Sequence, residues 1–351
     1  MSMPKSEHKS ASLILTLAAL IIIIAGVKTA QALLVPFLLA FFISIICAGP
    51  FFWLQQHKIP APIALLIVIG TVMLGGLAVV TLIGTSVNDF TNDLPIYQEK
   101  LRIQMLTLFD WLNNLGIKVS KDVLLEHFNP GSIMQSAASM LARAGGMLTN
   151  SFMILLTVVF ILFEAAGMPD KLRAALPSAD SSLTYFEKFF TSVRQYLAIK
   201  TLVSLGTGLV VTVGLLLLGL DYAPLWGMIA LLLNYVPNIG SIIAAVPAIL
   251  LSMVQLGPFP TLLVAALYLG TNVIMGNGVE PRLMGQKLGL STLVIFISLV
   301  FWGWVLGPVG MLLSVPLTMV VKIALEVNPT TRWMAILLSS DVSAKAIAEE
   351  Q

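Results

Sequence analysis

The sequence predicts an all-α fold, namely a polytopic helical membrane protein. We expect about eight membrane segments, including broken or re-entrant helices, and a small helical soluble arm. Of the 351 residues, 58% are hydrophobic and only 10% are charged, whereas soluble domains carry about 25% charged residues. The mean hydropathy is +0.97. Charge-free stretches recur along the chain, and a membrane helix needs about 20 mostly apolar residues.

Residues 1–86 are expected to form the N-terminal membrane segments, about three spans. Lys28 marks the first tight turn and residues 57–60 the second. The basic start of the chain and the Ala-Gln-Ala motif at 30–32 also resemble a secretory signal peptide. Apolar sequence resumes at once after that motif, so we expect an uncleaved first span. The three predicted spans lie near 12–27, 32–53 and 62–86.

The rest of the chain alternates between polar and apolar parts. Leu101, Met105, Leu108 and Leu112 recur at helical spacing, which is typical of an amphipathic helix, and Pro95 is expected to break the chain before it. The predicted parts are a helical arm outside the bilayer (87–147), a span (148–166), an amphipathic cytoplasmic linker (167–200), a C-terminal membrane transport core (201–328) and a polar cytoplasmic tail (329–351).

The stretch from 222 to 279 contains no Asp, Glu, Lys or Arg. A single helix of that length would be about 87 Å long at about 1.5 Å per residue, whereas the hydrocarbon core is about 30 Å thick. The chain must therefore turn back at least once in or near the membrane.

Two segments of the predicted core carry helix-breaking and polar residues together. Proline removes a helical donor and glycine permits a bend, and paired broken helices point to the binding site of a transporter. The alternative is that both segments are ordinary turns at the bilayer surface. The candidate transport residues are Asn234, Pro237, Asn238, Gly240 and Ser241 in the first segment, and Asn272, Asn277, Glu280, Pro281 and Arg282 in the second.

Glu280 is the strongest candidate for ion coupling, because an ionisable side chain at membrane depth is costly and usually functional. It is expected to pair with Arg282 or to carry a coupling proton, unless both residues lie in a wetted loop. Glu164, at the end of the fourth span, is the second candidate. Its plainer interpretation is a side chain that reaches the interface from a helix end.

Enzyme chemistry is not indicated. The sequence has no P-loop, no HExxH motif and no metal-ligand spacing among its three histidines and single cysteine, Cys47. We therefore expect no enzyme, cofactor or metal, and transport driven by a gradient. A net charge of +2 gives no argument for nucleic acid. Lys5, Lys9 and Lys58 favour a cytoplasmic N-terminus, and we expect the C-terminus to be cytoplasmic as well.

Two long blocks resemble the autoinducer-2 exporter family of bacterial inner-membrane proteins. They are LNYVPNIGSIIAAVPAIL at 233–250 and the run from GNGVEPRLMG through FWGWVLGPVGMLLSVPL at 276–326. The similarity also extends into the first half of the chain. It implies export of autoinducer-2, a small neutral polyhydroxylated furanone derivative, by an elevator-type motion in a homo-oligomer, a pentamer.

The resemblance does not fix the substrate, because other relatives are described as sodium/proton antiporters. A neutral polyol would be bound by the asparagines without a fixed charge, whereas a monovalent cation (sodium or lithium)/proton antiporter would need an intramembrane carboxylate such as Glu280. A third alternative is a passive oligomeric pore or scaffold. The predicted partners are a small polar substrate, the lipid bilayer and further copies of the chain.

Overall fold

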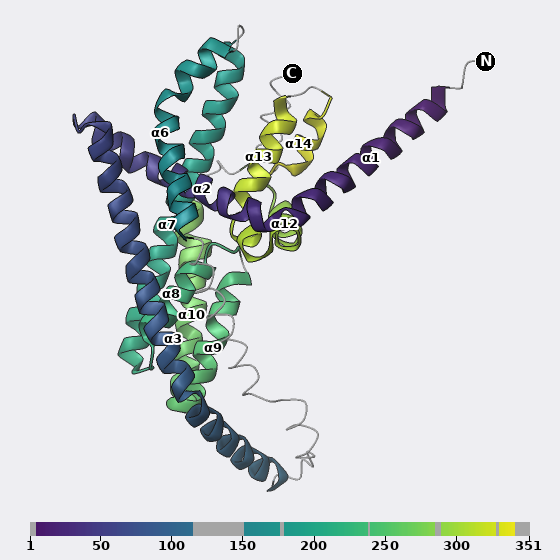
Figure 1. The fold of residues 1–351 in the computed structure, drawn as a ribbon. Helices are drawn as coiled ribbons and strands as arrows, with labels where there is room; N and C mark the ends of the chain where they lie inside the picture. The colour runs from purple at the N-terminus through teal and green to yellow at the C-terminus, as the bar shows by residue number, and fades with distance from the viewer. Residues whose placement is uncertain are drawn as a thin grey trace. The chain divides into compact units, whose positions relative to one another are not determined.

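The computed structural model describes residues 5–114, 151–175, 179–237, 239–284, 289–327 and 330–340. This part of the chain is helical throughout, and its one strand-like feature is an isolated bridge between Leu290 and Ser339. The helices (Figure 1) are α1 (Lys5–Thr29), α2 (Gln31–Gln56), α3 (Ala61–Asn114), α6 (Ser151–Ala175), α7 (Ala179–Leu218), α8 (Ala223–Leu233), α9 (Ile239–Gln255), α10 (Pro258–Asn272), the π-helix η2 (Val273–Val279), α11 (Glu280–Met284), α12 (Thr292–Leu312), α13 (Ser314–Val327) and α14 (Arg332–Leu338).

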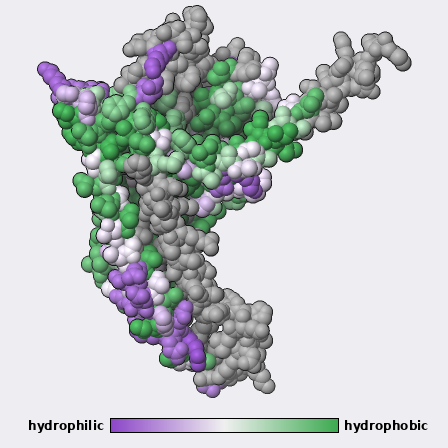
Figure 2. Space-filling model, in the orientation of Figure 1, coloured by the Kyte–Doolittle hydropathy of each residue, from purple (hydrophilic) through white to green (hydrophobic). Residues whose placement is uncertain are grey.

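The described helices confirm a polytopic membrane fold. Five of them are long and apolar enough to cross a bilayer, and shorter apolar helices include α8 and α9. Large apolar side chains point outward, such as Leu74 at 71% and Leu217 at 83% exposure; such a surface suits lipid rather than water. Apolar residues cover much of the face in Figure 2, while hydrophilic ones gather toward the C-terminal end of α3. The five candidate spans are 31–56, 61–104, 190–218, 258–284 and 292–312.

The first two predicted turns are confirmed. Helix α1 ends at Thr29 and α2 begins at Gln31, and a turn at 57–60 separates α2 from α3. The predicted break at Pro95 is wrong, because Pro95 lies inside α3, which continues to Asn114. A proline removes one backbone hydrogen bond and tends to kink a helix, but in α3 it does not end it.

The charge-free stretch after Asp221 turns back, as its length requires. It forms α8, α9 and α10, and α9 packs against both of its neighbours. At about 1.5 Å per residue, α8 with 11 residues is about 16 Å long and α9 with 17 residues is about 25 Å long. Both are shorter than the roughly 30 Å hydrocarbon core, and we therefore interpret α8 and α9 as a re-entrant hairpin.

The chain divides into two compact units. Unit 1 comprises residues 1–48, 153–189 and 289–351, and unit 2 comprises residues 49–152 and 190–288. The core of unit 2 is built by α3, α7, α8, α9 and α10 around Trp226, which is fully buried. Phe90 of α3 meets the Trp226 ring edge-on at 5.5 Å between centroids, a favourable aromatic geometry. This core holds the re-entrant hairpin against α3 and α7.

Unit 1 contains a stretch after residue 300 that is rich in glycine and proline. Helix α12 kinks at Gly307, whose φ of 68° is a conformation that glycine adopts without strain. After the kink, α13 packs back onto α12, and Trp302 Nε1 donates a hydrogen bond to Thr318 Oγ1 at 3.1 Å. Lys322 is buried and donates to the Gly289 carbonyl, which fixes the start of the segment leading into α12.

Candidate functional site

The first predicted break is the tip of the re-entrant hairpin. Residues 234–238 separate α8 from α9, and the tip places Asn234 directly after α8. Gly240 is buried there, and a Cβ atom on it would lie 1.8 Å from the Leu233 carbonyl oxygen. The return of the chain is therefore possible only with glycine at 240, which explains the glycine after Pro237.

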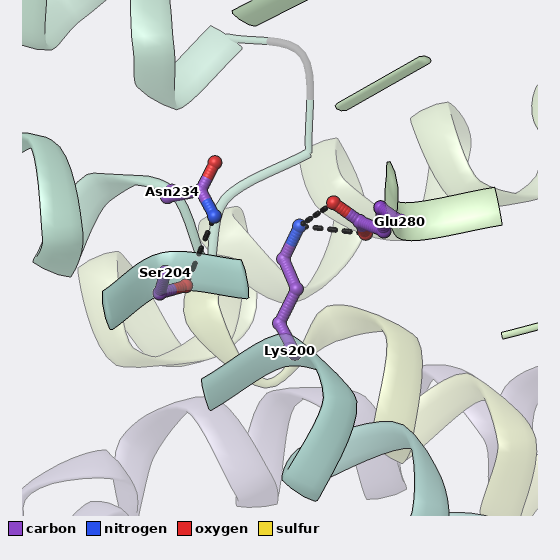
Figure 3. A network of polar contacts seen from close by, with 4 residues as sticks. All are labelled: Lys200, Ser204, Asn234 and Glu280. Atoms are coloured by element: carbon purple, nitrogen blue, oxygen red, sulfur yellow. Dashed lines mark hydrogen bonds and ion pairs between the residues drawn. The ribbon is translucent and has the colours of Figure 1, made fainter. Parts of the chain in front are cut away.

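Side chains at the hairpin tip are hydrogen-bonded to α7. The Asn234 amide donates to Ser204 Oγ at 3.0 Å, and the Tyr235 hydroxyl donates to Thr201 Oγ1 at 2.8 Å. In Figure 3 the amide nitrogen of Asn234 points toward Ser204, and its oxygen points away. The amide nitrogen of Asn234 is used in the bond to Ser204, and its side-chain oxygen is left as a hydrogen-bond acceptor.

The second predicted break is not a break. Residues 273–279 form the π-helix η2, which joins α10 to α11 within one candidate span. Glycine and proline there predicted a non-helical segment, but the N–H of Glu280 bonds the Met275 carbonyl, five residues earlier. That wider bond spacing accommodates Pro281, which has no N–H to give. Single π-helical turns inside α-helices are rare and often lie at functional sites.

Helix α7 runs antiparallel to the α10–η2–α11 helix. Gly214 lies against Leu267, Gly206 against Met275, and Lys200 binds Glu280. Lys200 Nζ is 2.8 Å from each carboxylate oxygen of Glu280. The exposed fractions of the two side chains are 5% for Lys200 and 18% for Glu280. Both residues lie inside helices that are long and apolar enough to cross a membrane, and the ion pair is largely buried.

The sequence suggested that Glu280 pairs with Arg282. In the structure Glu280 pairs with Lys200 instead. Arg282 is exposed, and residues two apart on a helix do not face each other. Lys200 was missed because the sequence placed it at the end of a polar linker. A helical projection could have found it: Lys200 shares a buried face with Val193, Leu197, Ser204 and Thr207. Its partner, 80 positions away, could not have been named without the structure.

Only part of the predicted residue set comes together. Ser204 and Lys200 are one turn apart on α7, so Asn234 and Glu280 approach the same helix (Figure 3). Of the others, Pro237 and Gly240 shape the hairpin, Ser241 lies in the first turn of α9, and Asn272 ends α10. Three more are exposed on η2 and α11, namely Asn277, Pro281 and Arg282. Asn238 lies outside the described residues.

Glu164 has a different environment. It lies on α6 in unit 1 with its side chain 54% exposed, and it pairs with Lys171 on the same helix. An exposed pair of this kind contributes little. Glu164 thus lacks the burial that distinguishes Glu280. It is not a helix-end residue either, because α6 continues past it to Ala175.

The chemistry of the site is that of polar recognition. It presents an amide, hydroxyls and one neutralised charge pair. Among the described residues there is no group of three or more His, Cys, Asp or Glu side chains that could hold a metal ion. The Thr207 hydroxyl, on the face of α7 that carries Lys200 and Ser204, is buried and has no hydrogen-bond partner within the described chain. Such a group is costly unless water or a ligand reaches it.

Comparison with known proteins decides the family. The profile of the "AI-2E family transporter" matches residues 17–329. The chain belongs to the AI-2E transporter family. Three relatives match over nearly their whole length. They are the AI-2 transport protein TqsA of Escherichia coli K12 (38% identical, over 97% of this chain and 98% of the relative), the putative transport protein YhhT of the same strain (37%, 96% and 97%) and a putative transport protein of Haemophilus influenzae (41%, 93% and 95%).

This AI-2E family member is thus a bacterial multi-pass membrane transporter. The family resemblance noted in the sequence is confirmed. The relatives are named as transport proteins.

Proposed function

We propose that the chain exports a small neutral polar metabolite, autoinducer-2, and that a gradient of an ion or of the substrate itself, not ATP, drives this transport. The observation that carries this proposal is the hydrogen-bonded tip of the re-entrant hairpin, where Asn234 meets Ser204 at the middle of α7. Irregular backbone at membrane depth is tolerated where protein or a water-filled cavity surrounds it. The similar E. coli protein is named AI-2 transport protein, and this name is the basis for the proposed substrate.

The polar groups of the site suit a neutral polyol. Asn234 offers an acceptor oxygen, and Ser204 and the unpartnered Thr207 add hydroxyls on one face of α7. The one strong charge, Glu280, is neutralised by Lys200, so an uncharged solute meets no bare ion. We place the centre of the transport site at Asn234 and Glu280, which both approach α7. The other predicted site residues stay a prediction, namely Pro237, Asn238, Gly240, Ser241, Asn272, Asn277, Pro281 and Arg282.

Replacing Asn234 with alanine is expected to lower efflux of autoinducer-2 about tenfold, because one substrate hydrogen bond of about 1.4 kcal/mol is lost. Early efflux is measured from cells that lack the gene and carry each variant. Asn114→Ala, at the exposed end of α3, is the matched control and retains wild-type efflux. Equal efflux by Asn234→Ala and wild type would remove Asn234 from the site.

A second candidate function is antiport of sodium or lithium against protons. The observation that favours it is a carboxylate, Glu280, that is only 18% exposed inside a candidate span. Everted vesicles would then show sodium- or lithium-dependent dissipation of a pH gradient, and Glu280→Gln would abolish it. A pH gradient that neither sodium nor lithium dissipates would rule out the antiport function.

A passive pore is the remaining alternative. It would be identified by downhill flux of substrate that is not coupled to any ion and by the absence of uphill accumulation.

The assembly and orientation complete the proposal. We place the protein in the bacterial inner membrane as a homo-oligomer, a pentamer, with both termini in the cytoplasm. Light scattering of the detergent-solubilised protein measures the oligomer number. A C-terminal green fluorescent protein fusion, which fluoresces only when the C-terminus is cytoplasmic, checks the orientation.

A further inference from the structure

Arg194 of α7 lies against α2 at a position that glycine keeps open. Arg194 and Gly49 both belong to unit 2. A Cβ atom on Gly49 would lie 3.1 Å from Arg194 Nη2 and 3.5 Å from Arg194 Nε. The guanidinium group therefore rests directly on the backbone of α2, and a larger side chain at position 49 would push it away. Arg194 is nevertheless exposed, so part of the guanidinium group faces the surroundings of the protein.

This guanidinium group has donors to offer. Among the described residues, Arg194 takes part in no ion pair and no hydrogen bond. Glu280, the acidic side chain on the neighbouring α11, is already bound by Lys200. A guanidinium group carries several N–H donors in a planar fork that matches the oxygens of a phosphate group. Arg194 is therefore equipped to bind an anion that comes from outside the chain.

The surroundings of Arg194 favour a place near the lipid headgroups. The candidate span of α7 begins at Phe190, so Arg194 lies about one helical turn from its start. On α2, the face that carries Gly49 leads at four-residue spacing to Trp53 and His57, whose ring centroids are 4.3 Å apart. Trp53 is 57% exposed, and exposed tryptophan is enriched where a membrane meets water.

Two further cations lie at the same end of unit 2. Because α7 runs antiparallel to the α10–η2–α11 helix, the start of α7 and the end of α11 are at one end, and Arg282 is exposed there. Lys58 is exposed in the turn that follows α2. Neither cation has an ion pair within the described chain. Basic pockets between membrane helices attract the headgroups of anionic lipids.

We propose that Arg194, held in place on Gly49, binds the phosphate group of an anionic phospholipid between α2 and α7. A phosphate ion from solution offers the same oxygens. The exposed Trp53 and the position at the start of a candidate span favour the lipid. Arg282 and Lys58 add positive charge around this lipid site but are not required to touch the same phosphate group.

The test is the thermal stability of the purified full-length protein in neutral detergent with added phosphatidylglycerol or phosphatidylcholine. We expect phosphatidylglycerol to raise the Tm of wild type by about 2–4 °C more than phosphatidylcholine does, because only the first lipid carries a net negative charge. Arg194→Gln is expected to lose this difference in Tm. Arg102→Gln, which removes an equal charge from the exposed surface of α3, is expected to keep it.

Gly49→Leu distinguishes the position of the guanidinium group from its charge. This variant keeps Arg194 but fills the space where the group rests, and leucine is a good helix former. We expect it to lose the difference in Tm as Arg194→Gln does. Either variant keeping the full difference would overturn the inference. An equal rise in Tm with inorganic phosphate would also overturn it, because the ligand would then be a phosphate ion and not a lipid.

Native mass spectrometry of wild type gives a result that does not depend on the folding of any variant. From an equal mixture of the two lipids, wild type is expected to retain phosphatidylglycerol in preference to phosphatidylcholine. Equal retention of both lipids contradicts the inference. Neither measurement involves a transported solute, so the outcome for the lipid site is independent of the outcome for autoinducer-2 export.

Discussion

Glu280→Ala is expected to lower the free energy of unfolding by about 3–5 kcal/mol, because it leaves the Lys200 ammonium buried without its partner. Lys200 is 5% exposed and its ion pair joins α7 to α11, so water cannot easily replace the carboxylate. Efflux is expected to fall with the folded fraction. The measurement is thermal unfolding of the purified variant in detergent, compared with wild type.

The matched variants are Lys200→Met and the double variant Lys200→Met/Glu280→Met. Replacing both charges with apolar side chains is often neutral or stabilising, so the double variant is expected to regain most of the lost stability. If the stability lost in the double variant equalled the sum of the losses in the two single variants, Lys200 and Glu280 would not be energetically coupled. A double variant that is stable but transports poorly would separate the role of the pair in transport from its role in folding.

Gly240→Ala is expected to prevent the re-entrant hairpin from closing. The added Cβ would lie 1.8 Å from the Leu233 oxygen and 2.8 Å from the Leu233 carbonyl carbon. These are backbone atoms at the end of α8, so no side-chain rotation relieves the overlap, and α8 and α9 must separate. We expect loss of efflux and a large fall in the yield of monodisperse protein, measured by size-exclusion chromatography.

Gly270→Ala is the control for this prediction. Gly270 lies in α10, and a Cβ there meets nothing within 4 Å. Alanine in a helix interior is favoured over glycine by roughly 0.5–1 kcal/mol, so this variant is expected to fold and transport like wild type. If Gly240→Ala folded and transported as well as Gly270→Ala, the close approach of Gly240 to the Leu233 carbonyl group at the hairpin tip would be contradicted.

Much of the fold could be predicted because membrane helices are read from local composition. Charge-free length alone required the turn within 222–279, and Lys28 and residues 57–60 marked the first two turns correctly. The segment 272–282 was misread because glycine and proline signal a break and a π-helix equally. The distinction depends on where the Glu280 N–H bonds, which composition does not determine.

The site was harder to predict because its contacts join distant parts of the chain. Asn234 and Glu280 were identified by their unusual residue types in apolar surroundings, but their partners Ser204 and Lys200 lie on α7. Lys200 stands at the boundary of a polar segment, where a lysine is ordinarily solvated. Its burial becomes evident only from the helical face that it shares with Ser204 and Thr207. The division of the chain into arm, linker, core and tail stays a prediction.

The central claim is that this chain itself moves a small neutral polar solute across the membrane. Purified protein reconstituted into liposomes loaded with autoinducer-2 tests it most directly. We predict saturable loss of autoinducer-2 that is faster than from protein-free liposomes and is reduced by Asn234→Ala but not by Asn114→Ala. Loss at the same rate from liposomes with and without the protein would contradict the claim.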